Sequence, residues 1–448
     1  MNQAQKVPTI SLAMIVKNEE HTLRECLRST KDFVNEMVVV DTGSTDSTMD
    51  IAKEEGAKVY KTEWRDDFSL ARNTALQYCA CEWILQLDAD DRLVVKDRDA
   101  VFSLLNGSEA LGYIVTIHSI VENGNVFAPA LRLFKNHPSI KYEGIVHEQV
   151  YNSIERLGGK IIPLPLMIEH SGYENPKIHK NKAQRNVSLL KKYLSQHPDD
   201  ITSILHYGMG LVTLQQYGEA KEQLEKLLKN PSMPVTGRVL AFNLLGQIAN
   251  EEGKAEEALQ FAELSLKEFE NQFYGRSVAT VACIHLKQYE QALVFLREME
   301  EMSKRDDLTN RVFFYDTRPP DSELLELIGA CLAELGHYDK AFDYFLRSLE
   351  IDSGSSTVVQ HIQRLFGKVE ISEAFGKRIE SIVKSNSKHN PSLQLLWIDY
   401  LSSKGKYDAA KEYALNHSIN VREVLPIQVR WMIERGEANS VNDLLQLL

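Results

Sequence analysis

The chain has 448 residues, enough for two or three domains with separate hydrophobic cores. Its 43% hydrophobic and 25% charged content is typical of a globular protein, and its net charge of −12 argues against a general nucleic-acid-binding surface. The sequence shows neither a stretch of membrane-span length nor the pattern of a secretory signal. Because the five cysteines form no even disulfide framework, we expect a protein of the reducing cytoplasm.

Apolar runs of strand type alternate with amphipathic segments in the first part of the chain. Strands are expected at Ile10–Val16, Met37–Val40, Lys58–Tyr60 and Trp83–Leu87. Helices are expected at Glu20–Ser29, Asp46–Glu54 and Phe68–Tyr78. This alternation predicts an open, largely parallel α/β sheet, whose ligands bind beyond the carboxyl ends of the strands.

Polar residues follow three of these predicted strands. Asn18 follows the first, Asp41 the second, and Asp88, Asp90 and Asp91 the fourth. Carboxylates this close together repel one another unless a cation is present. Oxygen ligands suit Mg²⁺ or Mn²⁺, which usually share their coordination shell with substrate phosphates. The sequence therefore predicts a divalent metal site at one rim of the sheet, although a solvated acidic turn has the same composition.

The motifs IVKNEE, VVVDTGSTDST, FSLARNTAL and LQLDADD, in this order, resemble the N-terminal half of a family 2 glycosyltransferase with the Rossmann-like GT-A fold. The resemblance covers about residues 9–173 and implies a nucleotide-diphospho-sugar donor, usually a UDP-sugar, and an inverting transfer. It implies that Asp41 contacts the base, that Asp88 faces the ribose and that Asp90 ligates the metal at the diphosphate. The expected nucleotide-sugar-binding residues are Asn18, Asp41, Arg72 and Asp88.

Two of these residues also fit simpler roles. Asp41 is followed by Gly43 in a turn, and an aspartate commonly caps such a turn. Arg72 is close in sequence to Asp66 and Asp67, with which it could form an ion pair. Both alternatives stay open at the level of the sequence.

Short strand-type runs follow the acidic cluster, at residues 112–120, 131–136, 140–150 and 161–173. His147 and Glu148 come after the strand-like run Tyr142–Val146, and His170 closes the last apolar run. By the same resemblance, a carboxylate in this half is the general base and a late histidine completes the metal shell. Glu148 is therefore the first candidate base, followed by His147 and then Glu143, and His170 is the second metal ligand. The base takes the proton of an acceptor hydroxyl or thiol as that group attacks the anomeric carbon. Either histidine also fits a purely structural role.

The composition changes to helical segments after Pro176. Residues 176–199 predict a basic linker helix, whose cations either cover the active site or form a solvated face. From residue 200 onward, five segments share a helix-turn-helix template with an alanine near the start of the second helix. These alanines are Ala220, Ala258, Ala292, Ala341 and Ala410. The second and third are 34 residues apart, the tetratricopeptide period, so residues 200–448 predict an all-α solenoid behind a catalytic domain at 1–175.

This domain layout is similar to that of the sublancin-type bacteriocin S-glycosyltransferases, with FSLARN, LDAD, VHE and HSGY in matching places. The resemblance implies metal-assisted transfer to a Cys, Ser or Thr side chain of a peptide or protein that the repeats hold. The repeats also suit formation of a homodimer. If they serve only the acceptor, removing residues after about 200 abolishes transfer to peptide and spares donor hydrolysis. A cell-surface glycan transferase and a non-catalytic repeat scaffold with a degenerate transferase domain are the alternatives.

Overall fold

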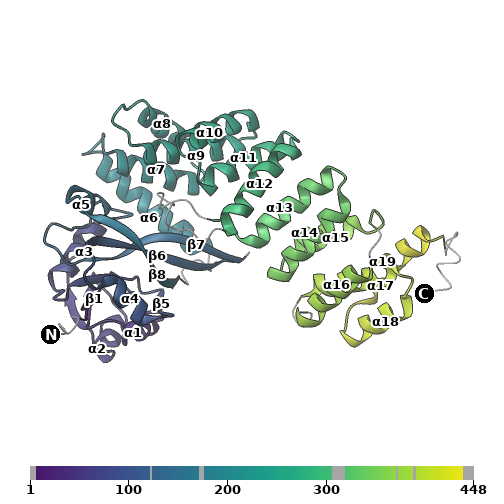
Figure 1. The fold of residues 1–448 in the computed structure, drawn as a ribbon, viewed down its shortest axis with the longest axis horizontal. Helices are drawn as coiled ribbons and strands as arrows, with labels where there is room; N and C mark the ends of the chain where they lie inside the picture. Colours follow the sequence, from purple (N-terminus) through teal and green to yellow (C-terminus); the bar gives the residue numbers. More distant parts are fainter. Residues whose placement is uncertain are drawn as a thin grey trace. The chain divides into compact units, whose positions relative to one another are not determined.

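The computed structural model describes residues 7–121, 124–170, 176–304, 318–369, 372–386 and 390–436. Its contacts divide the chain into two compact units, Met1–Leu286 with Arg305–Arg318, and Lys287–Lys304 with Pro319–Leu448. The first unit contains the whole sheet and the helices as far as α11, and the second contains helices (Figure 1). The predicted order, an α/β domain followed by helical repeats, is confirmed. The domain bounds at 175 and 199 stay predictions.

One eight-stranded sheet forms the centre of the first unit. Its strands are β1 (Ile10–Val16), β2 (Glu36–Asp41), β3 (Lys58–Lys61), β4 (Trp83–Gln86), β5 (Asp91–Val94), β6 (Ala110–Val121), β7 (Gly124–Lys135) and β8 (Lys160–His170). They lie in the order β3-β2-β1-β4-β7-β6-β8-β5. The first four in this order are parallel, as predicted. The other half is mixed, because β6 and β7 form a hairpin that reverses the chain direction and β7 and β5 pair with antiparallel neighbours.

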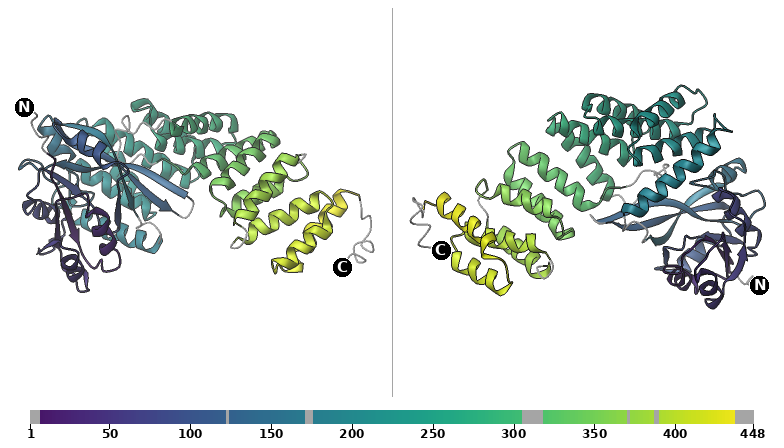
Figure 2. Two further views of the ribbon diagram at one scale, coloured as in Figure 1. Left: turned by 60° about the horizontal axis from the view of Figure 1, so that its bottom comes forward. Right: turned by 180° about the vertical axis from the view of Figure 1, so that it is seen from behind.

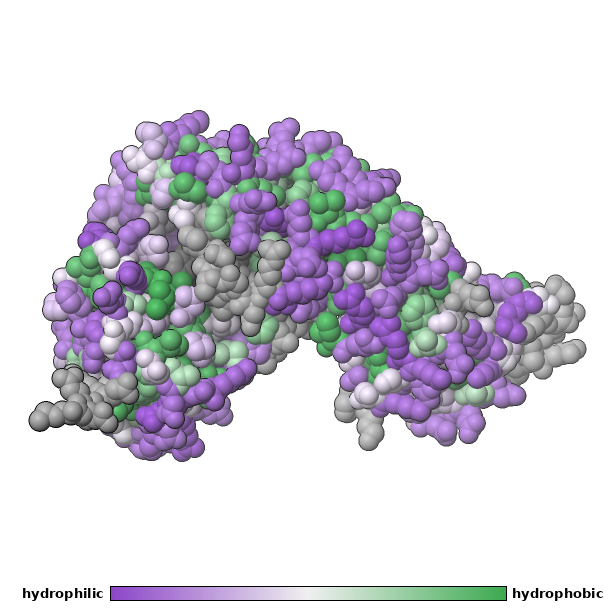
Figure 3. Space-filling model, in the orientation of Figure 1, coloured by the Kyte–Doolittle hydropathy of each residue, from purple (hydrophilic) through white to green (hydrophobic). Residues whose placement is uncertain are grey.

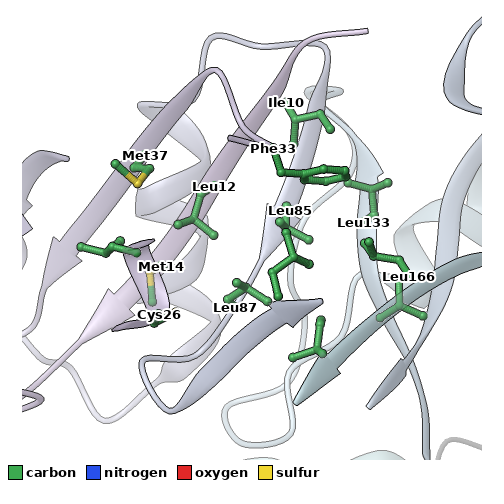
Figure 4. Close-up of a cluster of buried hydrophobic side chains, with 14 of the residues drawn as sticks. Ile10, Leu12, Met14, Cys26, Phe33, Met37, Leu85, Leu87, Leu133 and Leu166 are labelled. Carbon is green, nitrogen blue, oxygen red and sulfur yellow. The ribbon is translucent and has the colours of Figure 1, made fainter. Parts of the chain in front are cut away.

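Three of the parallel strands, β1, β2 and β4, are buried on both faces, which explains why they read as continuous apolar runs, whereas the edge strand β3 is partly exposed. Leu12, Met14 and Leu85 point into one core (Figure 4), whereas Ala13 and Ile84 contribute to a second core. The alternation follows from the two-residue period of a strand. The helices of this region are α1 (Leu23–Thr30), α2 (Thr48–Glu54), α3 (Phe68–Gln77), α4 (Arg98–Leu105) and α5 (Tyr151–Arg156).

The prediction of a strand at Tyr142–Val146 is wrong. This stretch is an irregular loop with one isolated bridge between Glu143 and Gln149. The side chain of Asn73 on α3 takes the place of a neighbouring strand: its Oδ1 accepts from the backbone N–H of Tyr142, and its Nδ2 donates to the Tyr142 carbonyl, each at 2.9 Å. The apolar residues of the loop are buried by packing against other elements, so their pattern imitates that of a strand.

The helices after the sheet form antiparallel pairs (Figures 1 and 2). In the first unit they are α6 (Pro176–Leu194), α7 (Ile201–Thr213), α8 (Tyr217–Leu228), α9 (Val235–Glu251), α10 (Ala255–Glu268) and α11 (Phe273–His285). Ala220 and Ala258 are fully buried between paired helices, as the repeat template predicts. The core of these helices includes Ile145 and Val146 from the loop after β7, so α6, α7 and α9 share one core with that loop.

The second unit continues the helical pattern. Its helices are α12 (Tyr289–Lys304), α13 (Asp321–Glu334), α14 (Tyr338–Ile351), α15 (Ser356–Leu365), α16 (Glu373–Asn386), α17 (Pro391–Ser403), α18 (Tyr407–Asn416) and α19 (Val421–Glu434). Ala292, Ala341 and Ala410 are again fully buried. Hydrophilic residues cover most of the surface in Figure 3, and hydrophobic residues form small patches there. Within the described ranges, every helix is too short or too polar to cross a bilayer.

Candidate active site

A cavity of about 440 Å³ opens beyond the carboxyl ends of β1 and β4. Lys17 follows the first of these strands, and Asp88 follows the second, as the rule for parallel sheets predicts. The predicted site residues that line this cavity are Arg72, Asp88, Asp90, His147, Glu148 and His170. Its volume is in the range of small-molecule sites, about 300–1,000 Å³.

The acidic cluster is a tight turn between β4 and β5. The backbone N–H of Asp91 donates to the Asp88 carbonyl at 3.0 Å, and the Asp91 carboxylate accepts from the Asp88 N–H at 2.8 Å. Asp91 is the first residue of β5, where it lies opposite His170 of β8. The sequence analysis did not predict β5, since four residues are too short to establish a period. The sheet pairing therefore brings together two groups that are 79 positions apart.

Asp90, Asp91 and His170 form a group of side chains that fits a divalent cation. One ligand atom from each lies within 4.8 Å of the others. Nδ1 of His170 is 2.8 Å from Oδ1 of Asp91 and 3.7 Å from Oδ1 of Asp90. Burial raises the pKa of Asp90, and the charges of Asp88 and Asp91 add to this rise. A cation would relieve this repulsion, so the residues present fit the predicted metal.

Asp91 is placed to orient His170. Asp91 is fully buried, and its two oxygens already contact the Asp88 N–H and the His170 ring. A carboxylate that holds one ring nitrogen of a histidine leaves the other nitrogen for a metal. Burial alone would lower the pKa of His170, but the hydrogen bond with Asp91 and the charge of Asp90 raise it.

Asp88 is held between two guanidinium groups. Nη2 of Arg72 lies 2.8 Å from Oδ1, and Nη2 of Arg132 lies 3.3 Å from Oδ2. Burial would raise the pKa of Asp88, but the charges of these two arginines outweigh burial and hold that pKa well below its usual range. Gln86 donates to the same carboxylate at 3.2 Å and accepts from Arg132. Asp88 is therefore ionised and fixed in place.

Arg72 also binds Glu148, which links the acidic cluster to the candidate base. Burial opposes the charge of the guanidinium, but Asp88 and Glu148 together raise the pKa of Arg72. The alternative pairing does not occur, because Asp67 caps α3 and Asp66 binds Lys192.

The loop that carries Glu148 is held by the helical region. His147 has a left-handed backbone, with φ of 56°, and its ring lies 4.8 Å from the ring of His206 on α7. Burial lowers the pKa of both histidines, that of His206 to about 3. Glu143 does not line the cavity and pairs with Arg156 instead.

Asp41 and Asn18 do not line the cavity but order the loops beside it. The buried carboxylate of Asp41 accepts from the backbone N–H groups of Gly43 and Ser44 at 3.0–3.1 Å, which is the turn-capping alternative. Asn18 has φ of 56° and accepts from the Thr45 N–H at 2.8 Å. Their contacts with a nucleotide stay predictions.

The sequence analysis missed several cavity residues. Arg132 and Gln86 are polar residues inside the apolar runs LRLF and WILQL, and that interruption was an available signal. Glu19 lines the cavity as well, and burial raises its pKa. The basic helix α6 is not only a solvated face, because its residues Lys182 and Arg185 line the cavity. Ser171–Tyr173 of the HSGY motif lie outside the described residues.

Two parts of this chain are similar to known protein families. Residues 11–156 match the family described as glycosyl transferase family 2, and residues 322–354 match a tetratricopeptide repeat. A TPR repeat-containing protein of Synechococcus elongatus is 34% identical over 267 residues, which cover 58% of this chain and 66% of the relative. The SPbeta prophage-derived glycosyltransferase SunS of Bacillus subtilis is 31% identical over 229 residues, which cover 50% of this chain and 54% of the relative. The chain thus spans between half and two thirds of the length of these relatives.

Proposed function

Because residues 11–156 form a glycosyl transferase family 2 domain, we propose that this protein transfers a sugar from a UDP-sugar to a side chain of a peptide or protein, with inversion at the anomeric carbon. The observation that carries the proposal is the group formed by Asp90, Asp91 and His170, of which Asp90 and His170 line the cavity at the carboxyl end of β4. Its position beyond the carboxyl ends of the strands, where ligands of such sheets bind, supports a donor with a diphosphate leaving group.

On the donor side, Asp90 and His170 would hold Mg²⁺ or Mn²⁺, and Asp91 would orient the histidine. A bound divalent cation supplies neutralisation of the charge that develops on the leaving diphosphate. Asp88, fixed by Arg72 and Arg132, faces the cavity with an ionised carboxylate that suits a ribose hydroxyl. Asp41 and Asn18 shape the adjoining loops, and we propose that these loops bind the nucleobase of the donor.

On the acceptor side, Glu148 is the proposed base. It takes the proton of the attacking hydroxyl or thiol while the new bond to the anomeric carbon forms and the bond to the diphosphate oxygen breaks. The nucleoside diphosphate leaves with the electron pair of the broken bond, on the side opposite to the attack. The configuration of the anomeric carbon is therefore inverted. His147 is the second candidate, since burial lowers its pKa and a neutral imidazole can accept a proton. Glu143 is the weakest candidate, because it does not line the cavity.

A peptide or protein acceptor is supported by the tetratricopeptide match, because arrays of this class commonly present peptide-binding surfaces. Cys, Ser and Thr all supply a suitable nucleophile after loss of one proton. Helices α6, α7 and α9 of the first unit share a core with the loop of Glu148, which supports a link between the helical region and the proposed acceptor side.

The test uses purified full-length protein with Mn²⁺, a set of UDP-sugars and peptides that contain Cys, Ser or Thr. Released UDP and the mass of the peptides are measured. We expect one sugar to be added per modified side chain, and EDTA to abolish the reaction. Asp90→Asn should remove both UDP release and transfer, and Glu148→Gln should lower transfer by about 10²–10⁴-fold, the usual effect of a general base.

Glu143→Gln is the matched control, since it changes a nearby carboxylate outside the cavity and should leave transfer unchanged. If the wild-type protein neither binds a UDP-sugar nor releases UDP, and Asp90→Asn behaves like the wild type, the protein is a scaffold and the proposal is wrong. Addition of sugar to a glycan but to none of the peptides would overturn the acceptor assignment alone.

A further inference from the structure

Helix α6 lies outside residues 11–156 of the transferase domain, yet it forms one wall of the cavity. Among the α6 residues from 180 onward, Lys182, Arg185 and Asn186 line it. The helix is fixed by its packing against α7 and by the burial of Val187 and Leu190 in the core shared with the catalytic loop. Its cavity face is therefore part of the same compact unit as the acidic cluster.

Most cations of the cavity are engaged by protein groups. Arg72 and Arg132 bind the carboxylate of Asp88. The guanidinium of Arg185 lies 4.9 Å from the ring centre of Phe68 and donates to the side chain of Asn186, the neighbouring residue. These three groups are held by contacts with the protein, although Nη1 of Arg72 is buried without a hydrogen-bond partner and is a further donor for a ligand.

Lys182 differs from these arginines. Its Nζ lies 3.8 Å from Oδ2 of Asp90, which is longer than a hydrogen bond, and its side chain is 48% exposed. The ammonium thus stands beside the candidate metal ligand without being locked to it. A lysine on a flexible stem of this kind is a common partner of phosphate groups.

We propose that Lys182 binds the diphosphate of the donor from the α6 side of the cavity. This inference rests on the proposed function. A cation at Asp90 would repel the ammonium, and the diphosphate that such a cation attracts would offer it new anionic oxygens. Lys182 then discriminates a nucleoside diphosphate from the nucleoside alone, and it makes donor binding depend on a helix outside the transferase domain.

Lys17 is the competing cation. It also lines the cavity, is exposed, and follows β1. A diphosphate bound on that side would leave Lys182 without a role. The two lysines belong to different elements, so single substitutions separate the two positions.

The experiment is isothermal titration calorimetry of the full-length protein with UDP, UMP and uridine in the presence of Mn²⁺. The variants are Lys182→Gln, Lys182→Arg and Lys17→Gln. The matched control is Lys180→Gln, which removes the same charge from the same helix at an exposed position that does not line the cavity. Circular dichroism melting verifies that each variant has the helix content and stability of the wild type.

We expect Lys182→Gln to weaken UDP binding by about 10-fold to 100-fold, the loss of one charge-assisted contact, and to leave uridine binding unchanged. Lys182→Arg should retain most of the affinity, and Lys180→Gln should match the wild type. Unchanged UDP binding in Lys182→Gln, an equal loss for UDP and uridine, or a loss confined to Lys17→Gln would overturn the inference while leaving the donor class intact. Absence of UDP binding by the wild-type protein would instead refute the proposed function and the inference with it.

Discussion

His206 makes the stability of the first unit depend on pH. It lies on α7 with 5% of its surface exposed, and burial lowers its pKa to about 3. The ring of His147 lies 4.8 Å away, and its charge is the smaller of the two causes of this lowered pKa. His147 itself is next to Glu148, whose charge favours its protonated form, and to Arg185, whose charge opposes it.

The direction of this pH dependence follows from the number of protons bound by the native and unfolded states. An unfolded histidine has a pKa of about 6.5, so between about pH 3 and pH 6.5 the unfolded chain binds a proton that the native His206 does not. The native state is therefore fully favoured above about pH 6.5 and loses stability as the pH falls. A pH of 5 is about 1.5 units below the pKa of the unfolded histidine. The free energy of unfolding is therefore about 2 kcal/mol lower at pH 5 than at pH 8.

The assay is hydrogen exchange by mass spectrometry at pH 8 and pH 5, with rates corrected for the intrinsic effect of pH and with α7 peptides followed separately. The wild-type protein should lose about 2 kcal/mol of protection in α7. His206→Gln starts from lower stability, but its loss between the two pH values should be smaller by most of that amount. His21→Gln is the matched control, because its imidazole is 91% exposed.

An equal loss of α7 protection in the wild type and His206→Gln would refute the reasoning. That result would mean that His206 is protonated in the native state or that another group dominates. A loss equal in His21→Gln and the wild type is expected, since the His21 side chain is exposed and not part of the core around α7.

Three further predictions concern packing. Asn73→Ala removes the two hydrogen bonds of the buried Tyr142 backbone. The free energy of unfolding, measured in urea, should fall by about 1–3 kcal/mol, and kcat should fall as well. Gly329→Ala would place a Cβ 2.7 Å from the ring of Phe345, so the second unit should lose about 1–3 kcal/mol in thermal unfolding. Truncation after residue 200 removes part of the core that supports the catalytic loop, so donor hydrolysis, measured as UDP release, should fall as well as peptide transfer.

Each of these has a control. Thr74→Ala removes one exposed hydrogen bond on the same helix as Asn73 and should be nearly neutral. Gly218→Ala meets no atom within 4 Å and should not destabilise its helix. Donor hydrolysis at the wild-type rate by the truncated chain would show that the shared core does not support the active site, and it would restore the expectation drawn from the sequence.

The sequence by itself determined the elements that depend on local pattern. The strand at Ile10–Val16 has the predicted bounds, because a strand buried on both faces reads as an unbroken apolar run. The repeat alanines identified the paired helices, since only a small side chain fits where two helices pack closely. The position of Asp88 and Asp90 at a strand end likewise follows from local pattern and the rule for parallel sheets.

The tertiary structure decided which partners these residues have. Asp91 acquired its role through the pairing of β5 with β8. Arg72 binds both Asp88 and Glu148, the second of which is 76 positions away from it in the sequence. Helix α6 joined the site because its apolar face packs against α7 and the catalytic loop, which turns Lys182 toward the cavity. Such contacts depend on the order of strands and on the packing of distant segments, and neither is encoded in the period or composition of any single stretch.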